Sequence, residues 1–164
     1  MGFMKKINGR AKGQNAERKL AKLFATWWGG DFARTPLSGG FATSKFREDW
    51  NACGDLVTPD PTFPFCVESK KVEGWSLEQM LTSNKTKLHA WWEQTVKETP
   101  KGKIPLLVFT KNHAPLYAMM SYADATVCIN HTDGFIAVVN DFRVLIFPLS
   151  KLLSTTKGNW QYGR

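Results

Sequence analysis

The chain has 164 residues, 43% of them hydrophobic and 13% aromatic, which suits one globular domain with a buried core and argues against a disordered chain. Lys and Arg number 22 against 14 Asp and Glu, so the net charge of +8 favours an anionic partner, either nucleic acid or an acidic membrane. A basic protein that is merely soluble is the alternative.

The cysteines and the hydropathy of the sequence indicate the redox compartment and whether the chain enters a membrane. Cys53, Cys66 and Cys128 are an odd number without close spacing, so the sequence indicates neither a disulfide framework nor a thiolate metal site. No apolar segment follows Lys5 and Lys6, and no later run approaches the roughly 18 residues that span a bilayer. We therefore expect a protein of the reducing cytoplasm with no membrane partner.

The N-terminal part of the chain predicts an arm, a helix and a short strand. Residues 1–14 are basic and punctuated by glycine, and they predict a flexible arm. From Asn15 onward apolar residues recur at helical spacing until Gly29 and Gly30, which predicts an amphipathic helix. Residues 31–46 predict a short strand that runs into a loop rich in Pro, Gly and Ser.

Residues 53–72 contain two short apolar runs separated by a Pro-Asp-Pro turn, and they predict two neighbouring strands. Asp55 opens the first strand. Glu68 and Lys70 close the second one.

The rest of the chain continues with helix and strand signals. Ser76 and Gln79 form a capping box, which predicts one long helix to about Thr99. Residues 104–110 predict a buried strand. Further strand candidates and a short helix are predicted at 114–130, 134–140, 142–149 and 150–153.

The tail at about 155–164 combines Lys157, Trp160, Tyr162 and Arg164, which suits DNA binding, contact with a partner subunit or a flexible end. We find no repeat and no boundary within residues 1–164, so a single domain is expected. The order of elements predicts an α/β or α+β fold with a central mixed sheet flanked by helices.

The strand that ends near Lys70 carries the most informative charges. Side chains alternate along a strand, so Glu68 and Lys70 share one face while Val67 and Ser69 point to the other. A neighbouring strand that begins at Asp55 would bring a second carboxylate within a few ångströms.

Two clustered carboxylates raise each other's pKa unless positive charge lies between them. Their oxygens suit Mg²⁺ or Mn²⁺, and bound Mg²⁺ polarises a phosphodiester and activates water. Lys70 would then orient the water or stabilise charge that develops on the phosphate. An exposed ion pair between Glu68 and Lys70, contributing about 0–1 kcal/mol, is the structural alternative, and the pattern leaves both open.

Two stretches resemble known nucleases. The letters GDLV, followed thirteen residues after the Asp by VESK, resemble the signature of the PD-(D/E)xK nuclease superfamily, with Gly54 in place of its Pro. Residues 12–40 are similar to the opening of archaeal-type Holliday-junction-resolving enzymes, with a Lys-Gly start, a helix with an early Glu-Arg, a strand Arg and a Ser-Gly loop. The similarity in order and spacing continues to about residue 112.

The resemblance implies a catalytic role for each matching residue. Asp55 and Glu68 would bind Mg²⁺, with Mn²⁺ as an alternative, and Lys70 would be the superfamily lysine. Glu17 would complete the acidic cluster. Leu20 and Ala21, at the usual helical spacing, give Glu17 no ion partner, and attraction to the helix N-terminus is its structural alternative.

Further residues would contact the substrate or support the metal. Ser38 matches a family hydroxyl near the scissile phosphate, with an ordinary loop serine as the alternative. Gln79 would approach the metal from the start of its helix, or serve only as a helix cap. The DNA contacts that we expect, for which solvated surface charge is the alternative, are Arg34, Lys45, Lys71 and Lys111.

As a whole, the resemblance implies a restriction-endonuclease-like fold and a metal-dependent endonuclease that resolves four-way (Holliday) junctions in DNA. It implies a homodimer, because two symmetric cuts need two matched sites. The location would be the nucleoid or the cytoplasm of a host cell. Another PD-(D/E)xK nuclease, acting on flaps, in repair or in phage, is one alternative, and a non-catalytic DNA-binding module is the other.

Overall fold

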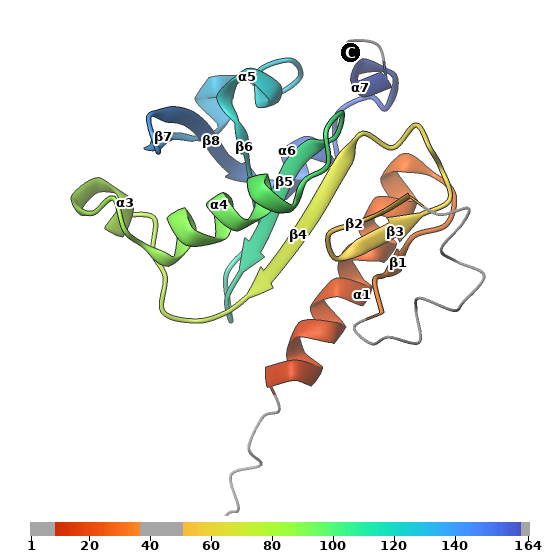
Figure 1. Ribbon diagram of the computed structural model, residues 1–164, viewed down its shortest axis with the longest axis horizontal. Coiled ribbons are helices and arrows are strands. Elements are labelled where there is room, and N and C mark those ends of the chain that lie inside the picture. The colour runs from red at the N-terminus through yellow and green to blue at the C-terminus, as the bar shows by residue number, and fades with distance from the viewer. Residues whose placement is uncertain (1–8, 37–50, 162–164) are drawn as a thin grey trace, which may run out of the picture.

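The computed structural model describes residues 9–36 and 51–161, whose elements surround one central sheet (Figure 1). The helices are α1 (Gly9–Trp28), α3 (Gln79–Thr82), α4 (Lys87–Glu98), α5 (Tyr122–Ala125), α6 (Leu149–Leu152) and α7 (Gly158–Gln161), with a 3₁₀ helix η2 (His131–Asp133). The strands are β1 (Ala33–Arg34), β2 (Asn51–Cys53), β3 (Leu56–Thr58), β4 (Phe65–Lys71), β5 (Ile104–Thr110), β6 (Tyr117–Ser121), β7 (Phe135–Val139) and β8 (Phe142–Pro148).

The central sheet has five strands in the order β4-β5-β6-β8-β7. β4 and β5 run parallel, from Phe65 opposite Ile104 to Lys71 opposite Thr110, and the other neighbours pair antiparallel. β5 is apolar along almost its whole length because helices cover both faces of the sheet there. This mixed sheet between helices confirms the predicted fold class.

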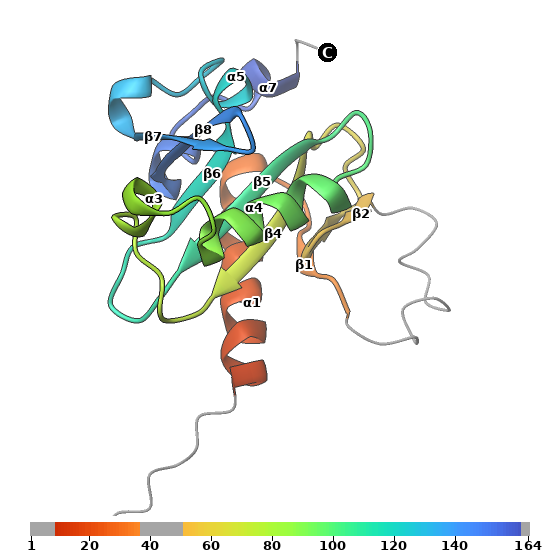
Figure 2. The same ribbon diagram turned by 60° about the vertical axis from the view of Figure 1, so that its left-hand side comes forward.

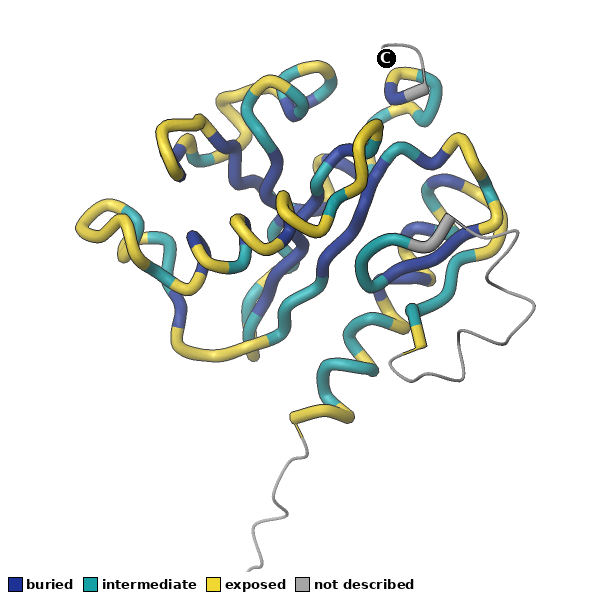
Figure 3. The backbone as a smooth tube through the Cα atoms, in the orientation of Figure 1, coloured by how far each residue is buried: buried dark blue, intermediate teal, exposed yellow. Residues whose placement is uncertain are grey.

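Two apolar clusters lie on opposite faces of this sheet, with α1 behind it and α4 in front (Figure 2). Phe24 of α1 shares one cluster with Val67 of β4, and Trp92 of α4 shares the other with Phe109 of β5. Successive side chains of a strand point to opposite faces, so β4 and β5 anchor both layers. Figure 3 shows the buried strands between the more exposed outer helices.

A smaller antiparallel sheet, in the order β1-β3-β2, lies beside β4 (Figure 1). β3 and β4 are the two strands that the sequence predicts as neighbours. They are adjacent, but they hydrogen-bond in different sheets, and within the described chain one parallel bridge, between Gly54 and Val67, joins the two sheets. β3 pairs with β2 instead because only two residues separate these strands, which favours a hairpin.

The predicted long helix of residues 76–99 is wrong, since the segment forms two helices, α3 and α4. Ser76 does accept a hydrogen bond from the backbone N–H of Gln79 (3.3 Å), but α3 ends after one turn and Ser83 is extended. A capping box formed by Thr86 and His89 starts α4 anew. Histidine replaces the usual Glu or Gln of this motif, so the sequence pattern hid the second start.

The described parts of the expected arm and tail contain helical residues. α1 begins at Gly9 instead of Asn15, so the last part of the expected basic arm is helical. In the expected tail, α7 places Trp160 at 7% exposure with its ring centroid 5.1 Å from that of Phe65. The ammonium of Lys157 lies 4.7 Å from the ring centroid of Trp28. These apolar and cation–π contacts hold the segment against the core.

The strand candidate at residues 114–130 is only partly right. It contains β6 and then α5, because the Ser121 hydroxyl accepts a hydrogen bond from the N–H of Asp124 and caps the helix. The predicted strands near residues 134–149 are β7 and β8, and the short helix after them is α6. No helix in the described part of the chain is long and apolar enough to cross a membrane.

Candidate active site

Asp55 lies at the tip of a tight hairpin. Cys53 of β2 pairs with Leu56 of β3, which leaves Gly54 and Asp55 as a two-residue turn. Gly54 has φ +69°. Glycine at the first of the two positions is what a type II′ hairpin turn requires. The Gly-Asp letters therefore encode a turn that projects one carboxylate.

The same glycine lets the hairpin approach β4 closely. A Cβ atom at Gly54 would come within 2.2 Å of the carbonyl oxygen of Val67. Proline, the usual residue of the superfamily signature at this position, has its φ fixed near about −65° and cannot adopt the observed turn. Glycine is thus a requirement of this hairpin, and the departure from the signature has a steric reason.

Backbone and side-chain hydrogen bonds fix Asp55 on the edge of β4. The N–H of Asp55 donates to the carbonyl of Val67 (2.7 Å), and the N–H of Ser69 donates to Oδ2 of Asp55 (2.7 Å). On the other side, the hydroxyl of Thr35 donates to the carbonyl of Gly54 (2.8 Å). The carboxylate is therefore part of the sheet's edge, and its position is set by the fold.

Glu68 and Lys70 share one face of β4, as the alternation of the strand predicts. Nζ of Lys70 lies 2.8 Å from Oε1 of Glu68, and the side chains are 22% and 10% exposed, respectively. The ion pair that we considered as the alternative is therefore formed, but it is mostly buried. Such a pair is costly to desolvate and is a weak reason for stability by itself.

Glu17 of α1 has an ion partner that its own helix does not supply. Nε of Arg34 in β1 lies 3.0 Å from Oε2 of Glu17, with side-chain exposures of 18% and 14%, respectively. Nη2 of the same guanidinium is buried and has no hydrogen-bond partner among the described residues. A buried donor without an acceptor is unfavourable, so an oxygen ligand that reached this atom would satisfy it.

Burial and two neighbouring glutamates affect the carboxylate of Asp55. The pKa of Asp55 is raised from 3.8 to about 6, mainly because burial disfavours its charged form and secondly because Glu68 is close. Glu17 adds to this rise, whereas the Ser69 N–H and the Lys70 ammonium oppose it. The site thus holds more negative charge than its two cations neutralise.

This donor set fits a divalent cation. As the side chains stand, the described residues contain no group of three or more His, Cys, Asp or Glu that could hold an ion, and Glu68 and Glu17 contact Lys70 and Arg34. Carboxylate oxygens are the ligands that Mg²⁺ and Mn²⁺ prefer. Burial, and secondly the nearby charge of Glu68, raise the pKa of Asp55, and a bound divalent ion would oppose this rise by stabilising the charged carboxylate.

The remaining predicted site residues are dispersed. Ser38 and Lys45 lie outside the described residues. Gln79 is exposed on α3, which both ribbon views place away from the hairpin of β2 and β3. Lys111 donates to the carbonyl of Trp75 (2.8 Å) and lies 4.6 Å from the centroid of its ring. These contacts make Lys111 part of the support of the loop after β4.

A basic pocket of about 290 Å³ lies next to the end of β4. Sequence reasoning named Lys71 and Lys111 but missed the other basic residues, because α1 and the loop after β5 meet only in the folded chain. The charged or imidazole-bearing residues that line the pocket are Lys19, Lys71, Lys111 and His113.

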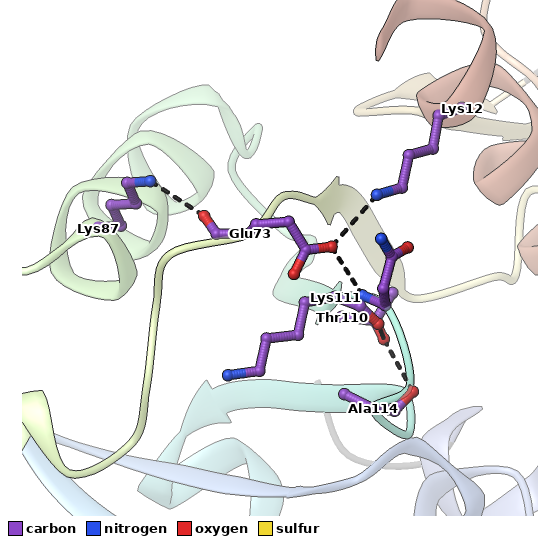
Figure 4. Close-up of polar contacts among 7 residues, drawn as sticks. Lys12, Glu73, Lys87, Thr110, Lys111 and Ala114 are labelled. Carbon is purple, nitrogen blue, oxygen red and sulfur yellow. Dashed lines mark hydrogen bonds and ion pairs between the residues drawn. The ribbon is translucent and has the colours of Figure 1, made fainter. Parts of the chain in front are cut away.

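Glu73 forms hydrogen bonds with three segments near this pocket (Figure 4). Its carboxylate accepts from Nζ of Lys12 (3.2 Å) and from the backbone N–H of Asn112 (2.8 Å), and its carbonyl accepts from Nζ of Lys87 (3.0 Å). α1, the start of α4 and the loop after β5 are therefore joined through one residue that follows β4.

The mixed sheet, the Asp-bearing hairpin and the Glu and Lys of β4 have the arrangement of a nuclease of the PD-(D/E)xK type. Residues 8–157 match the model of a family described as phage putative PDDEXK endonuclease, and the chain belongs to this family. The match supports the superfamily that the sequence resembles and does not extend to the archaeal-type junction resolvases. No curated protein and no solved structure matches the chain.

The close contact at Gly54 predicts a large loss of stability on substitution. Gly54→Ala should lower the free energy of unfolding by about 3 kcal/mol or more, because it adds a steric clash to an unfavourable φ. Gly29→Ala is the matched control, since Gly29 has φ +86° but no atom within 4 Å of a Cβ, and should cost about 1 kcal/mol. Equal losses in urea unfolding would show that the contact with Val67 is unimportant.

The raised pKa of Asp55 predicts a pH dependence of the metal-free protein. The folded state keeps the proton up to about pH 6, whereas the unfolded state releases it near 3.8, so stability falls as the pH rises through this window. We expect the free energy of unfolding in EDTA, measured relative to that of Asp55→Asn, to decrease between these values and to level off above about pH 7. A difference that rises with pH would contradict the assignment.

Proposed function

We propose that this protein is a divalent-metal-dependent endonuclease that hydrolyses phosphodiester bonds in DNA. The observation that carries the proposal is the carboxylate of Asp55, which the N–H of Ser69 holds on β4 and whose pKa is raised by burial and, secondly, by Glu68. Membership of a phage endonuclease family supports the same class of activity.

Asp55 and Glu68 are the proposed metal ligands, with Glu17 as a third carboxylate and Mg²⁺ as the cofactor, for which Mn²⁺ could substitute. A divalent ion bound there supplies Lewis-acid polarisation of the phosphodiester and lowers the pKa of an attacking water. The hydrogen bond from Ser69 leaves the other oxygen of Asp55, Oδ1, to serve as a ligand. A partly buried carboxylate fixed in this way costs little reorganisation when it binds.

Lys70 and Arg34 are the proposed cationic partners of the reaction. Nζ of Lys70, 2.8 Å from Oε1 of Glu68, would orient the attacking water or stabilise charge on the phosphate. Glu17 holds Nε of Arg34, which leaves Nη2 to donate to a non-bridging phosphate oxygen. Both cations then act on negative charge that increases in the transition state.

The basic pocket is the proposed path of the DNA backbone away from the cut. Lys71 directly follows Lys70 in the chain, and Lys19 of α1 and His113 of the loop after β5 also line the pocket. Lys45 and Ser38 stay predicted contacts. Binding through phosphates would be salt-dependent and would read little base sequence.

For the substrate we propose branched DNA, in particular the four-way junction, because of the similarity of residues 12–112 to junction-resolving enzymes. A homodimer with two-fold symmetry would supply the paired sites that symmetric cutting needs. The phage family favours action in the cytoplasm of a host cell, and a phage endonuclease that cuts flaps or duplex ends is the second candidate.

Cleavage assays on matched DNA substrates test this function. With Mg²⁺, the protein should cut a four-way junction at symmetric positions, and Glu68→Gln should lower the rate by at least about 10²-fold because it removes a ligand charge. Glu98→Gln, in an exposed part of α4, is the matched control and should cut normally. EDTA should abolish cleavage by all variants.

The outcome on other substrates separates the candidates. Equal cutting of linear duplex would contradict junction selectivity, and preferential cutting of flaps would favour the second candidate. Binding without cleavage, with either Mg²⁺ or Mn²⁺, would contradict the enzymatic proposal and indicate a DNA-binding module.

A further inference from the structure

Two cysteines far apart in the sequence meet where the hairpin touches β4. Cys53 ends β2, and Cys66 is the second residue of β4. The parallel bridge joins Gly54 to Val67, so the residues immediately before them run side by side. Directly opposite residues on neighbouring strands have Cα atoms about 5 Å apart, within the range that a disulfide spans.

The contacts of the two thiols support this placement. Sγ of Cys53 lies 3.9 Å from the carbonyl oxygen of Phe65, the residue that precedes Cys66 in β4. Both cysteines are free, Cys66 is 3% exposed and Cys53 is partly exposed. One thiol is therefore accessible to a reagent while its neighbour lies in the interior.

We propose that Cys53 and Cys66 form a reversible disulfide site that links the Asp55 hairpin covalently to β4. In the first step Cys53, as the thiolate, attacks one sulfur of a low-molecular-weight disulfide, which releases one thiol and leaves a mixed disulfide. Cys66 then loses its proton and attacks Cys53 Sγ, and the second thiol leaves. Two electrons and two protons pass from the cysteines to the reagent.

The link would join the two segments that carry the proposed metal ligands. Each cysteine precedes a carboxylate residue by two positions, Cys53 before Asp55 and Cys66 before Glu68. A disulfide closes residues 53–66 into a loop and restricts the unfolded chain, so it should stabilise the contact between the hairpin and β4. In a reducing cytoplasm both cysteines stay as free thiols, and exposure to an oxidant forms the disulfide.

Peptide mapping of the full-length protein tests the link. The reduced protein is equilibrated with oxidised glutathione, quenched in acid, alkylated in denaturant and digested with trypsin. Cys53 and Cys66 fall in one tryptic peptide, residues 48–70, whereas Cys128 falls in residues 112–143. We expect the first peptide to lose two hydrogens and to carry no alkyl group. Alkylation of both its cysteines, or glutathione that stays on Cys53 beside an alkylated Cys66, would overturn the proposal.

Thermal unfolding gives a second readout that needs no substitution of the buried cysteine. Oxidised wild-type protein should melt about 5 °C above the reduced form. Cys53→Ser should lose this redox-dependent shift, and Cys128→Ser, the control, should keep it. Equal melting temperatures of the oxidised and reduced wild type would contradict a stabilising link.

Discussion

The hydrogen bond from the N–H of Ser69 to the carboxylate of Asp55 is the interaction on which the site depends. β4 is an edge strand of the central sheet, and an edge leaves backbone donors and acceptors unpaired. The hairpin satisfies two of them with one residue, through the N–H and the carboxylate of Asp55. Gly54 makes this approach possible, because any side chain there would meet the Val67 carbonyl.

This packing has an electrostatic cost that explains the surrounding charges. Burial of Asp55 beside Glu68 and Glu17 raises its pKa to about 6. Lys70 pairs with Glu68 and Arg34 pairs with Glu17, so among the described residues neither cation forms an ion pair with Asp55. Replacing such buried pairs by apolar residues is often neutral or stabilising. A stability argument therefore does not account for the cluster, whereas the proposed role in binding a cation and phosphate would give each of these charges a function.

The sequence correctly predicted the features that follow from the local spacing of apolar and charged residues. The alternation of β4 placed Glu68 and Lys70 together, and the apolar run of residues 104–110 gave β5 correctly. It could not find the partnership of Glu17 with Arg34 or the basic pocket, since these join segments that meet only in the folded chain. It also missed the second helix start, because His89 fills a capping position where Glu or Gln is expected. The roles of Ser38 and Lys45 stay predictions.

Anomalous diffraction from crystals soaked in Mn²⁺ tests the central claim most directly, that Asp55 and Glu68 form a site for a divalent cation. The account predicts a manganese peak within about 2.0–2.3 Å of an oxygen of each carboxylate, with Glu68 turned away from Lys70. Manganese bound only elsewhere, with Glu68 still paired to Lys70 and the wild-type protein saturated with the ion, would contradict it.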